Sequence, residues 1–240
     1  MPFFDDSGYD ETIDRGQFWS AFAIFGGQLE KMIAVNIAWA LQFAPAIFAM
    51  IFINTPDVIR ILLIIYTIIA VPPATAVLYG LMREATNHES IDIGLARELF
   101  GELWASGYKS LAPLSGFLGF VLWSINIANT ANWFIVSVLV QVLLLLLLLS
   151  ANYWGCILAE SPKSSAYAIL LRSARLVWLY PLRSLLLSLM VGLAVVLGAI
   201  SIGGLALVVP VIITLLQAQM YKAITRESFN RKKQYGAVSR

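Results

Sequence analysis

Six long apolar segments constrain the fold of this 240-residue chain more than any other feature. A helix needs about 20 apolar residues, and at least about 17, to cross a hydrocarbon layer about 30 Å thick. The charged content of 12% is half of the ~25% that soluble domains carry, and hydrophobic residues make up 60% of the chain. We therefore expect an all-α polytopic membrane bundle of six transmembrane helices, arranged as three hairpins. The expected spans are Ile33–Ile53, Val58–Met82, Leu111–Ile127, Trp133–Tyr153, Leu182–Ile200 and Ile202–Tyr221.

The distribution of Lys and Arg predicts the orientation of these spans. Basic residues are retained on the cytoplasmic side of a membrane, and they cluster in alternate connections and at the two chain ends. The opposite side has Arg60 alone. We therefore expect a protein of the cell membrane with both termini cytoplasmic, and aromatic residues such as Tyr153 and Trp154 at the inner interface. The basic residues on the expected cytoplasmic side are Arg15, Lys31, Arg83, Arg97, Lys109, Lys163, Arg172, Arg175, Arg183, Lys222, Arg226, Arg231, Lys232, Lys233 and Arg240.

Two polar tails flank the expected membrane domain. Residues 1–16 are acidic and lack the basic start of a signal peptide, so we expect a cytosolic tail there. Residues 17–224 form the expected six-helix domain. Residues 225–240 are basic, which suits contact with anionic lipid at about 1 kcal/mol per charge and requires no nucleic acid. The lipid bilayer is the first expected partner, and the oligomeric state is left open.

The connection after the second span has the pattern of an amphipathic helix. Its apolar residues fall on one helical face, and Ser90 is the expected N-cap. One interpretation is an interfacial helix that covers the protein's own bundle, and the other is a docking site for a partner. The connection containing Trp178 has a similar pattern, so we expect a second cytosolic interfacial helix there. The residues proposed for docking are Leu95, Leu99, Phe100, Leu103 and Trp104.

The chain offers little sign of catalytic chemistry. No acid or base falls inside the six apolar cores, which disfavours a pump or an ion-coupled transporter. Asn36, Gln42 and Gln141 are neutral polar residues that either line a hydrophilic path or form hydrogen bonds between helices. The single histidine, His88, has no visible nucleophile beside it, and no metal-ligand or nucleotide motif occurs. We therefore expect a protein that is not an enzyme and has no cofactor or metal.

Two adjacent prolines interrupt the second span in the stretch IIAVPPATAVLYGLMRE. Pro72 and Pro73 lack amide hydrogens and crowd the carbonyls one turn back, so a regular helix is costly there. Such a disturbance is tolerated in a bilayer where it faces protein, and small residues spaced four apart allow another backbone to approach. We expect a kink packed inside the bundle. The alternative is a half-helix that begins at Pro73, ends at Glu84 and points its N-terminus at a ligand.

The segments VNIAWALQFAP and VPPATAVLYGLMRE, followed by an aromatic-rich amphipathic helix, resemble the YesL-like family of bacterial multi-pass membrane proteins. In members of that family, a helix with the pattern N-L-L-W is followed by a segment with the pattern G-P-A-T-A-A-L-Y. The chain departs from the pattern in having Pro72 at the glycine position and about twenty extra residues between the two motifs. The matching residues are Asn36 and Trp39 in the first motif and Pro73, Ala74, Thr75, Ala76, Leu78 and Tyr79 in the second.

The resemblance implies association with bacterial carbohydrate uptake systems and no defined activity. The leading hypothesis is an accessory protein that contacts the membrane subunits of a sugar ABC transporter. The alternative hypothesis is a permease component that moves a neutral solute past Asn36, Gln42 and Gln141. A membrane-embedded enzyme that acts on lipid is a third and weaker reading, because the chain has only one histidine.

Overall fold

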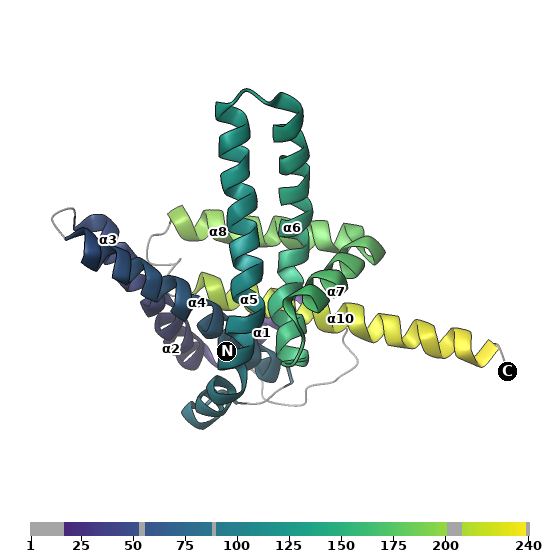
Figure 1. Cartoon of the computed structure of the whole chain (residues 1–240). Helices are drawn as coiled ribbons and strands as arrows, with labels where there is room; N and C mark the ends of the chain where they lie inside the picture. Colours follow the sequence, from purple (N-terminus) through teal and green to yellow (C-terminus); the bar gives the residue numbers. More distant parts are fainter. Residues whose placement is uncertain (1–16, 53–55, 88–89, 201–207, 239–240) are drawn as a thin grey trace.

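The structure is a computed structural model that describes residues 17–52, 56–87, 90–200 and 208–238. The regular elements in these ranges are all helices, as expected for an all-α fold (Figure 1). The expected acidic tail, His88 and the turn between the last two expected spans lie outside the described residues. The elements are α1 (Gln17–Gly27), α2 (Leu29–Ala40), η1 (Leu41–Phe43), α3 (Ala44–Ile51), α4 (Asp57–Thr86), α5 (Ile93–Thr130), α6 (Phe134–Glu160), α7 (Ala166–Leu179), α8 (Pro181–Ile200) and α10 (Val209–Val238).

Among the described residues, five helical segments are long and apolar enough to cross a membrane. They are the continuous run Leu29–Ile51, which joins α2, η1 and α3, together with α4, α5, α6 and α8. These segments coincide with the first five expected spans. The sixth expected span begins in residues that are not described, and its remainder forms the apolar start of α10, whose later turns are basic. The sixth span therefore stays a prediction.

The amphipathic segment and the third span form one helix, so the expected division between them is wrong. α5 runs for 38 residues from Ile93 to Thr130 and continues through Pro113. Its N-cap is Asp92, whose Oδ1 accepts the Leu95 amide at 2.7 Å, and not Ser90. The first turns of α5 pack on α4, where Leu99 and Leu103 are buried. By contrast, α7 is a separate helix, capped by Ser165 and ended just before Pro181.

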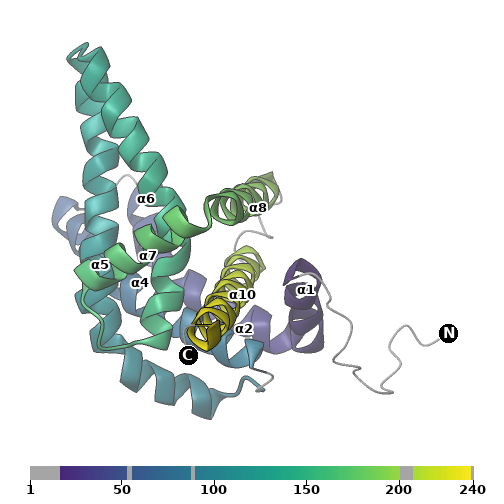
Figure 2. The same ribbon diagram turned by 90° about the vertical axis from the view of Figure 1, so that its right-hand side faces the viewer.

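Consecutive membrane-length helices pair, but the pairs do not run parallel to one another. α3 packs on α4, α5 on α6, and α8 on α10. Figure 1 shows the α5–α6 hairpin projecting from the centre of the molecule and the α3–α4 pair projecting in another direction. In Figure 1 α8 runs across the direction of the α5–α6 hairpin, and Figure 2 shows that it lies to one side of that hairpin. The arrangement of six spans as three hairpins of one bundle therefore stays a prediction.

The buried core lies where the second halves of α4 and α6 meet α7 and α10. Met82, Tyr153, Ile169 and Leu215 are among its fully buried large side chains. Apolar side chains are exposed instead at the outer end of the α5–α6 hairpin, where Phe134 is 79% accessible. Apolar exposure on this scale marks a surface that is covered by another apolar phase, as lipid would cover it in a membrane.

Two residues expected at the inner interface belong to this core. Tyr153 and Trp154 are buried within the protein and do not face outwards, and their level at the inner interface stays a prediction. The Tyr153 hydroxyl and the Ser184 hydroxyl form a hydrogen bond of 2.8 Å, and the Trp154 ring nitrogen donates to Ser173 Oγ at 3.2 Å. Serines on α7 and α8 thus satisfy the polar ends of both rings, which lets α6 extend seven residues past the expected end of the fourth span.

Candidate functional site

The proline pair lies inside an unbroken helix. α4 is continuous from Asp57 to Thr86, and both Pro72 and Pro73 are buried within it. A Cβ added to Gly107 of α5 would lie 2.9 Å from Pro73 Cα and 3.2 Å from the Pro72 carbonyl oxygen. The two backbones therefore meet at the prolines with no room for a side chain between them. This confirms that the prolines face the interior, and the half-helix that begins at Pro73 is wrong.

The motif residues around the prolines form packing contacts with neighbouring helices. The Trp39 ring nitrogen donates to Thr75 Oγ1 at 3.1 Å, which links α2 to α4. Ala76 and Leu78 are buried, and Ala74 is half-buried on the same helix. The bond between Trp39 and Thr75 joins the two motifs, which are 36 positions apart in the sequence. Residues of the two motifs therefore contact each other within this chain.

Asn36 holds the beginning of the last helix. It is fully buried, and its side-chain oxygen accepts the Val211 amide at 3.1 Å. The first amides of a helix have no partner within the helix, so a side chain from α2 satisfies one of them at the start of α10. The hydrogen bond connects residues 175 positions apart in the sequence.

Tyr79 begins a buried chain of hydrogen bonds across four helices. Its hydroxyl donates to the Gln217 side-chain oxygen on α10. Gln217 Nε2 donates to Asn152 Oδ1 on α6 at 3.0 Å, and Asn152 Nδ2 donates to Ser188 Oγ on α8 at 2.6 Å. Gly155 makes room for the Tyr79 ring, because a Cβ at Gly155 would clash with the carbon atoms of that ring. A connected network of satisfied polar groups is rigid, so it holds α4, α6, α8 and α10 together.

The polar residues proposed for a solute path are not brought together. Asn36 binds the α10 amide, whereas Gln42 donates to the Ala38 carbonyl and accepts from the Tyr66 hydroxyl. Gln141 donates to Ser137 Oγ near the outer end of α6, at 3.2 Å. Each side chain belongs to a separate local set of hydrogen bonds. Asn36 and Gln42 form bonds between helices, as considered from the sequence, whereas the bond from Gln141 to Ser137 stays within α6.

The residues proposed for docking divide into two groups. Leu99 and Leu103 are buried against Gly80, and Leu95 packs on the core. Phe100 and Trp104 remain 48% and 41% exposed, with ring centroids 4.7 Å apart. The apolar face of this segment is thus mainly used inside the protein, and the aromatic pair is the part that stays accessible.

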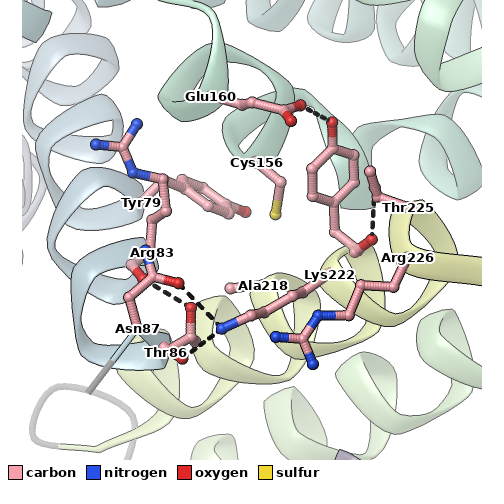
Figure 3. A pocket seen from close by; sticks show the side chains of 11 residues that line it. Tyr79, Arg83, Thr86, Asn87, Cys156, Glu160, Ala218, Lys222, Thr225 and Arg226 are labelled. Carbon is pink, nitrogen blue, oxygen red and sulfur yellow. Dashed lines mark hydrogen bonds between the residues drawn. The ribbon is translucent and has the colours of Figure 1, made fainter. Parts of the chain in front are cut away.

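A pocket of about 230 Å³ opens where the C-terminal ends of α4 and α6 meet the middle of α10, and sequence reasoning did not identify it (Figure 3). Tyr79, Cys156 and Ala218 form its apolar part. Arg83, Lys222 and Arg226 provide basic groups around it, and Glu160 is the acidic residue in its lining. The segments that line it are more than fifty residues apart in the sequence, so no local pattern reveals the pocket. One feature of the sequence could have indicated this pocket: charged residues follow the second, fourth and sixth expected spans, which end on the same expected side of the membrane.

Hydrogen bonds fix most of the polar groups of this pocket. Arg83 donates to the Ala159 carbonyl and pairs with Glu84. The Glu160 carboxylate accepts from the Tyr221 hydroxyl. Lys222 Nζ donates to the Thr86 carbonyl at 2.7 Å and to Asn87 Oδ1 at 3.0 Å, both of them neutral acceptors.

The electrostatic environment of Lys222 disfavours its positive charge. Partial burial, and then the nearby Arg226 guanidinium, lower the pKa of Lys222 below its ordinary value. In the part of the chain that the structure describes, no group of three or more His, Cys, Asp or Glu residues could hold a metal ion. The basic residues Lys222 and Arg226 lie beside the apolar part of the pocket formed by Tyr79, Cys156 and Ala218. This arrangement can bind an anion electrostatically.

Comparison of the chain with protein-family models, with curated proteins and with solved structures finds no match.

Proposed function

We propose that this chain is a non-enzymatic, multi-pass protein of a bacterial cell membrane that assists carbohydrate uptake by contacting the membrane subunits of a sugar ABC transporter. The resemblance of the Asn36–Trp39 and Pro73–Tyr79 segments to the YesL-like family supports the class of partner. The polar residues of the spans support an accessory role. Trp39, Tyr79 and Asn36 form hydrogen bonds between helices, and Gln42 and Gln141 lie in separate local sets of bonds.

The single observation that carries this proposal is the exposed pair Phe100 and Trp104. Large aromatic side chains are the residues that dominate binding energy at protein interfaces. Here the two rings contact each other in a tilted arrangement, on a helix whose other side is fixed by buried Leu99 and Leu103. An aromatic pair on a rigid helix loses little conformational entropy on binding, so this surface suits a partner helix better than it suits solvent.

Purification of the tagged chain in mild detergent, with co-eluting proteins identified by mass spectrometry, tests the proposal. The variant Phe100→Ala/Trp104→Ala is compared with Phe120→Ala/Trp123→Ala, an exposed aromatic pair on the outer half of the same helix. We expect transporter subunits to be recovered with the wild type and the control pair, and lost with the first variant. Repeated purification of the tagged chain without any co-eluting transporter subunit would refute the proposal.

Transport assays separate this function from the permease alternative. Vesicles that contain only this chain should take up no labelled sugar, because an accessory protein does not move solute by itself. Uptake by such vesicles would favour the permease instead. Loss of that uptake in Gln141→Leu would assign it to the outer half of the α5–α6 hairpin.

A further inference from the structure

The pocket between the C-terminal ends of α4 and α6 and the middle of α10 combines two chemical features that the proposed function does not use. Its apolar part is formed by the Tyr79 ring, Cys156 and Ala218, and its basic part by Lys222 and Arg226 (Figure 3). In Figure 3 the Lys222 ammonium and the Arg226 guanidinium lie near each other along one edge of the pocket. An apolar wall beside two cations is the complement of an amphiphile that carries an anionic group.

The charges of the pocket leave positive charge in excess. Arg83 is neutralised by its ion pair with Glu84, and Glu160 accepts a hydrogen bond from a neutral hydroxyl. Lys222 is held by neutral oxygens, and Arg226 is exposed and pairs with no carboxylate among the described residues. Two adjacent cations repel each other, which agrees with the lowered pKa of Lys222. An anion between them would remove this repulsion.

The geometry favours a phosphate as that anion. A guanidinium binds phosphate oxygens in a bidentate manner, and a lysine ammonium adds a point charge. The pocket volume of about 230 Å³ lies below the ~300–1,000 Å³ of pockets that enclose a whole drug-sized ligand. It is large enough for a phosphate headgroup whose apolar chains remain outside, along the exposed apolar helices.

The position of the pocket in the chain indicates a lipid as the carrier of the phosphate. It lies at the ends of the second and fourth expected spans and just beyond the sixth, on the side where basic residues gather. Basic pockets between membrane helices on the cytoplasmic side bind anionic headgroups. We propose that Lys222 and Arg226 bind the phosphate of an anionic phospholipid headgroup, with Tyr79 and Ala218 facing its apolar part.

Native mass spectrometry of the full chain with added phosphatidylglycerol, and separately with phosphatidylcholine, tests the site. The test variant is Lys222→Gln/Arg226→Gln. The control is Arg172→Gln/Arg175→Gln, which removes the same charge from exposed positions of α7. Because charge-assisted hydrogen bonds are the strong ones, we expect the test variant to bind phosphatidylglycerol at least about tenfold more weakly. The control is expected to bind it as the wild type does.

Further measurements distinguish a lipid from a free phosphate ester. Glycerol phosphate and inorganic phosphate, added as competitors, should displace phosphatidylglycerol poorly because they lack the apolar part. Efficient displacement by either would overturn the lipid assignment, and equal loss of binding in the control variant would overturn the site. If the double variant does not fold, the exposed single variant Arg226→Gln and the pocket-filling Ala218→Leu carry the test. Unchanged binding in both of these would also refute it.

Discussion

Replacement of Gly107 by alanine tests whether α5 truly meets the proline pair of α4 backbone to backbone. The added Cβ would lie 2.7 Å from Ala76 Cβ and 2.9 Å from Pro73 Cα, and neither atom belongs to a flexible side chain. The two helices must therefore move apart. Overpacking of a filled interface costs about 1–3 kcal/mol, whereas alanine at an open helical position gains up to about 1 kcal/mol over glycine.

Gly101→Ala is the matched control, because a Cβ at Gly101 of the same helix meets no atom within 4 Å. The two variants share the gain in helix propensity, so the difference between them isolates the contact at the prolines. We expect Gly107→Ala to be less stable than Gly101→Ala by about 1–3 kcal/mol. For a chain of this size that corresponds to a Tm lower by roughly 2–12 °C.

Thermal unfolding of both variants in the same detergent, followed by circular dichroism, measures the difference. The scan rate and the detergent concentration must be identical, because unfolding of such proteins is often irreversible. Equal Tm values for the two variants would refute the close approach of the helices, and with it the explanation of how the prolines are tolerated.

Three further predictions concern hydrogen bonds and charge. Trp39→Phe removes the bond to Thr75 and should lower the free energy of unfolding by about 0.5–1.5 kcal/mol, with little further loss when Thr75→Val is added. Asn36→Leu leaves the Val211 amide without this acceptor and should cost about 1–3 kcal/mol, measured by thermal unfolding against Asn126→Leu as an exposed control. Lys222 has a lowered pKa, so the unfolded chain binds more protons there, and the free energy of unfolding should rise with pH towards about 10.4. Denaturation over a pH series should show this rise in the wild type and a smaller one in Lys222→Met.

Much of the helical fold could be predicted from the sequence. The apolar runs coincide with five described segments, because a stretch of that length and composition has few alternatives to a helix. The interior position of Pro72 and Pro73 was also predictable, since the small residues around them invite a close approach. Gly107, which makes that approach, could not be named because its partner lies on another helix.

The failures come from tertiary contacts that no local pattern encodes. Ser90 and Asp92 are both of the residue types that cap helices, and the prediction of Ser90 was wrong because the helix begins two residues later. The amphipathic face containing Leu99 and Leu103 suited a membrane surface as well as it suited α4, so one long helix was divided into two. The burial of Tyr153 and Trp154 could not be predicted, because the serines that bond their rings are at least nineteen positions away in the sequence.

The bond between Asn36 and Val211 has a consequence for how the chain is made. Asn36 leaves the ribosome 175 residues before Val211, so their contact can form only after the start of α10 has been synthesised. The α2 helix must therefore enter the membrane long before its place against α10 exists. A chain truncated before α10 should keep its early helices and yet lack this contact, so the synthesis of α10 is the step that allows α2 to reach its final packing.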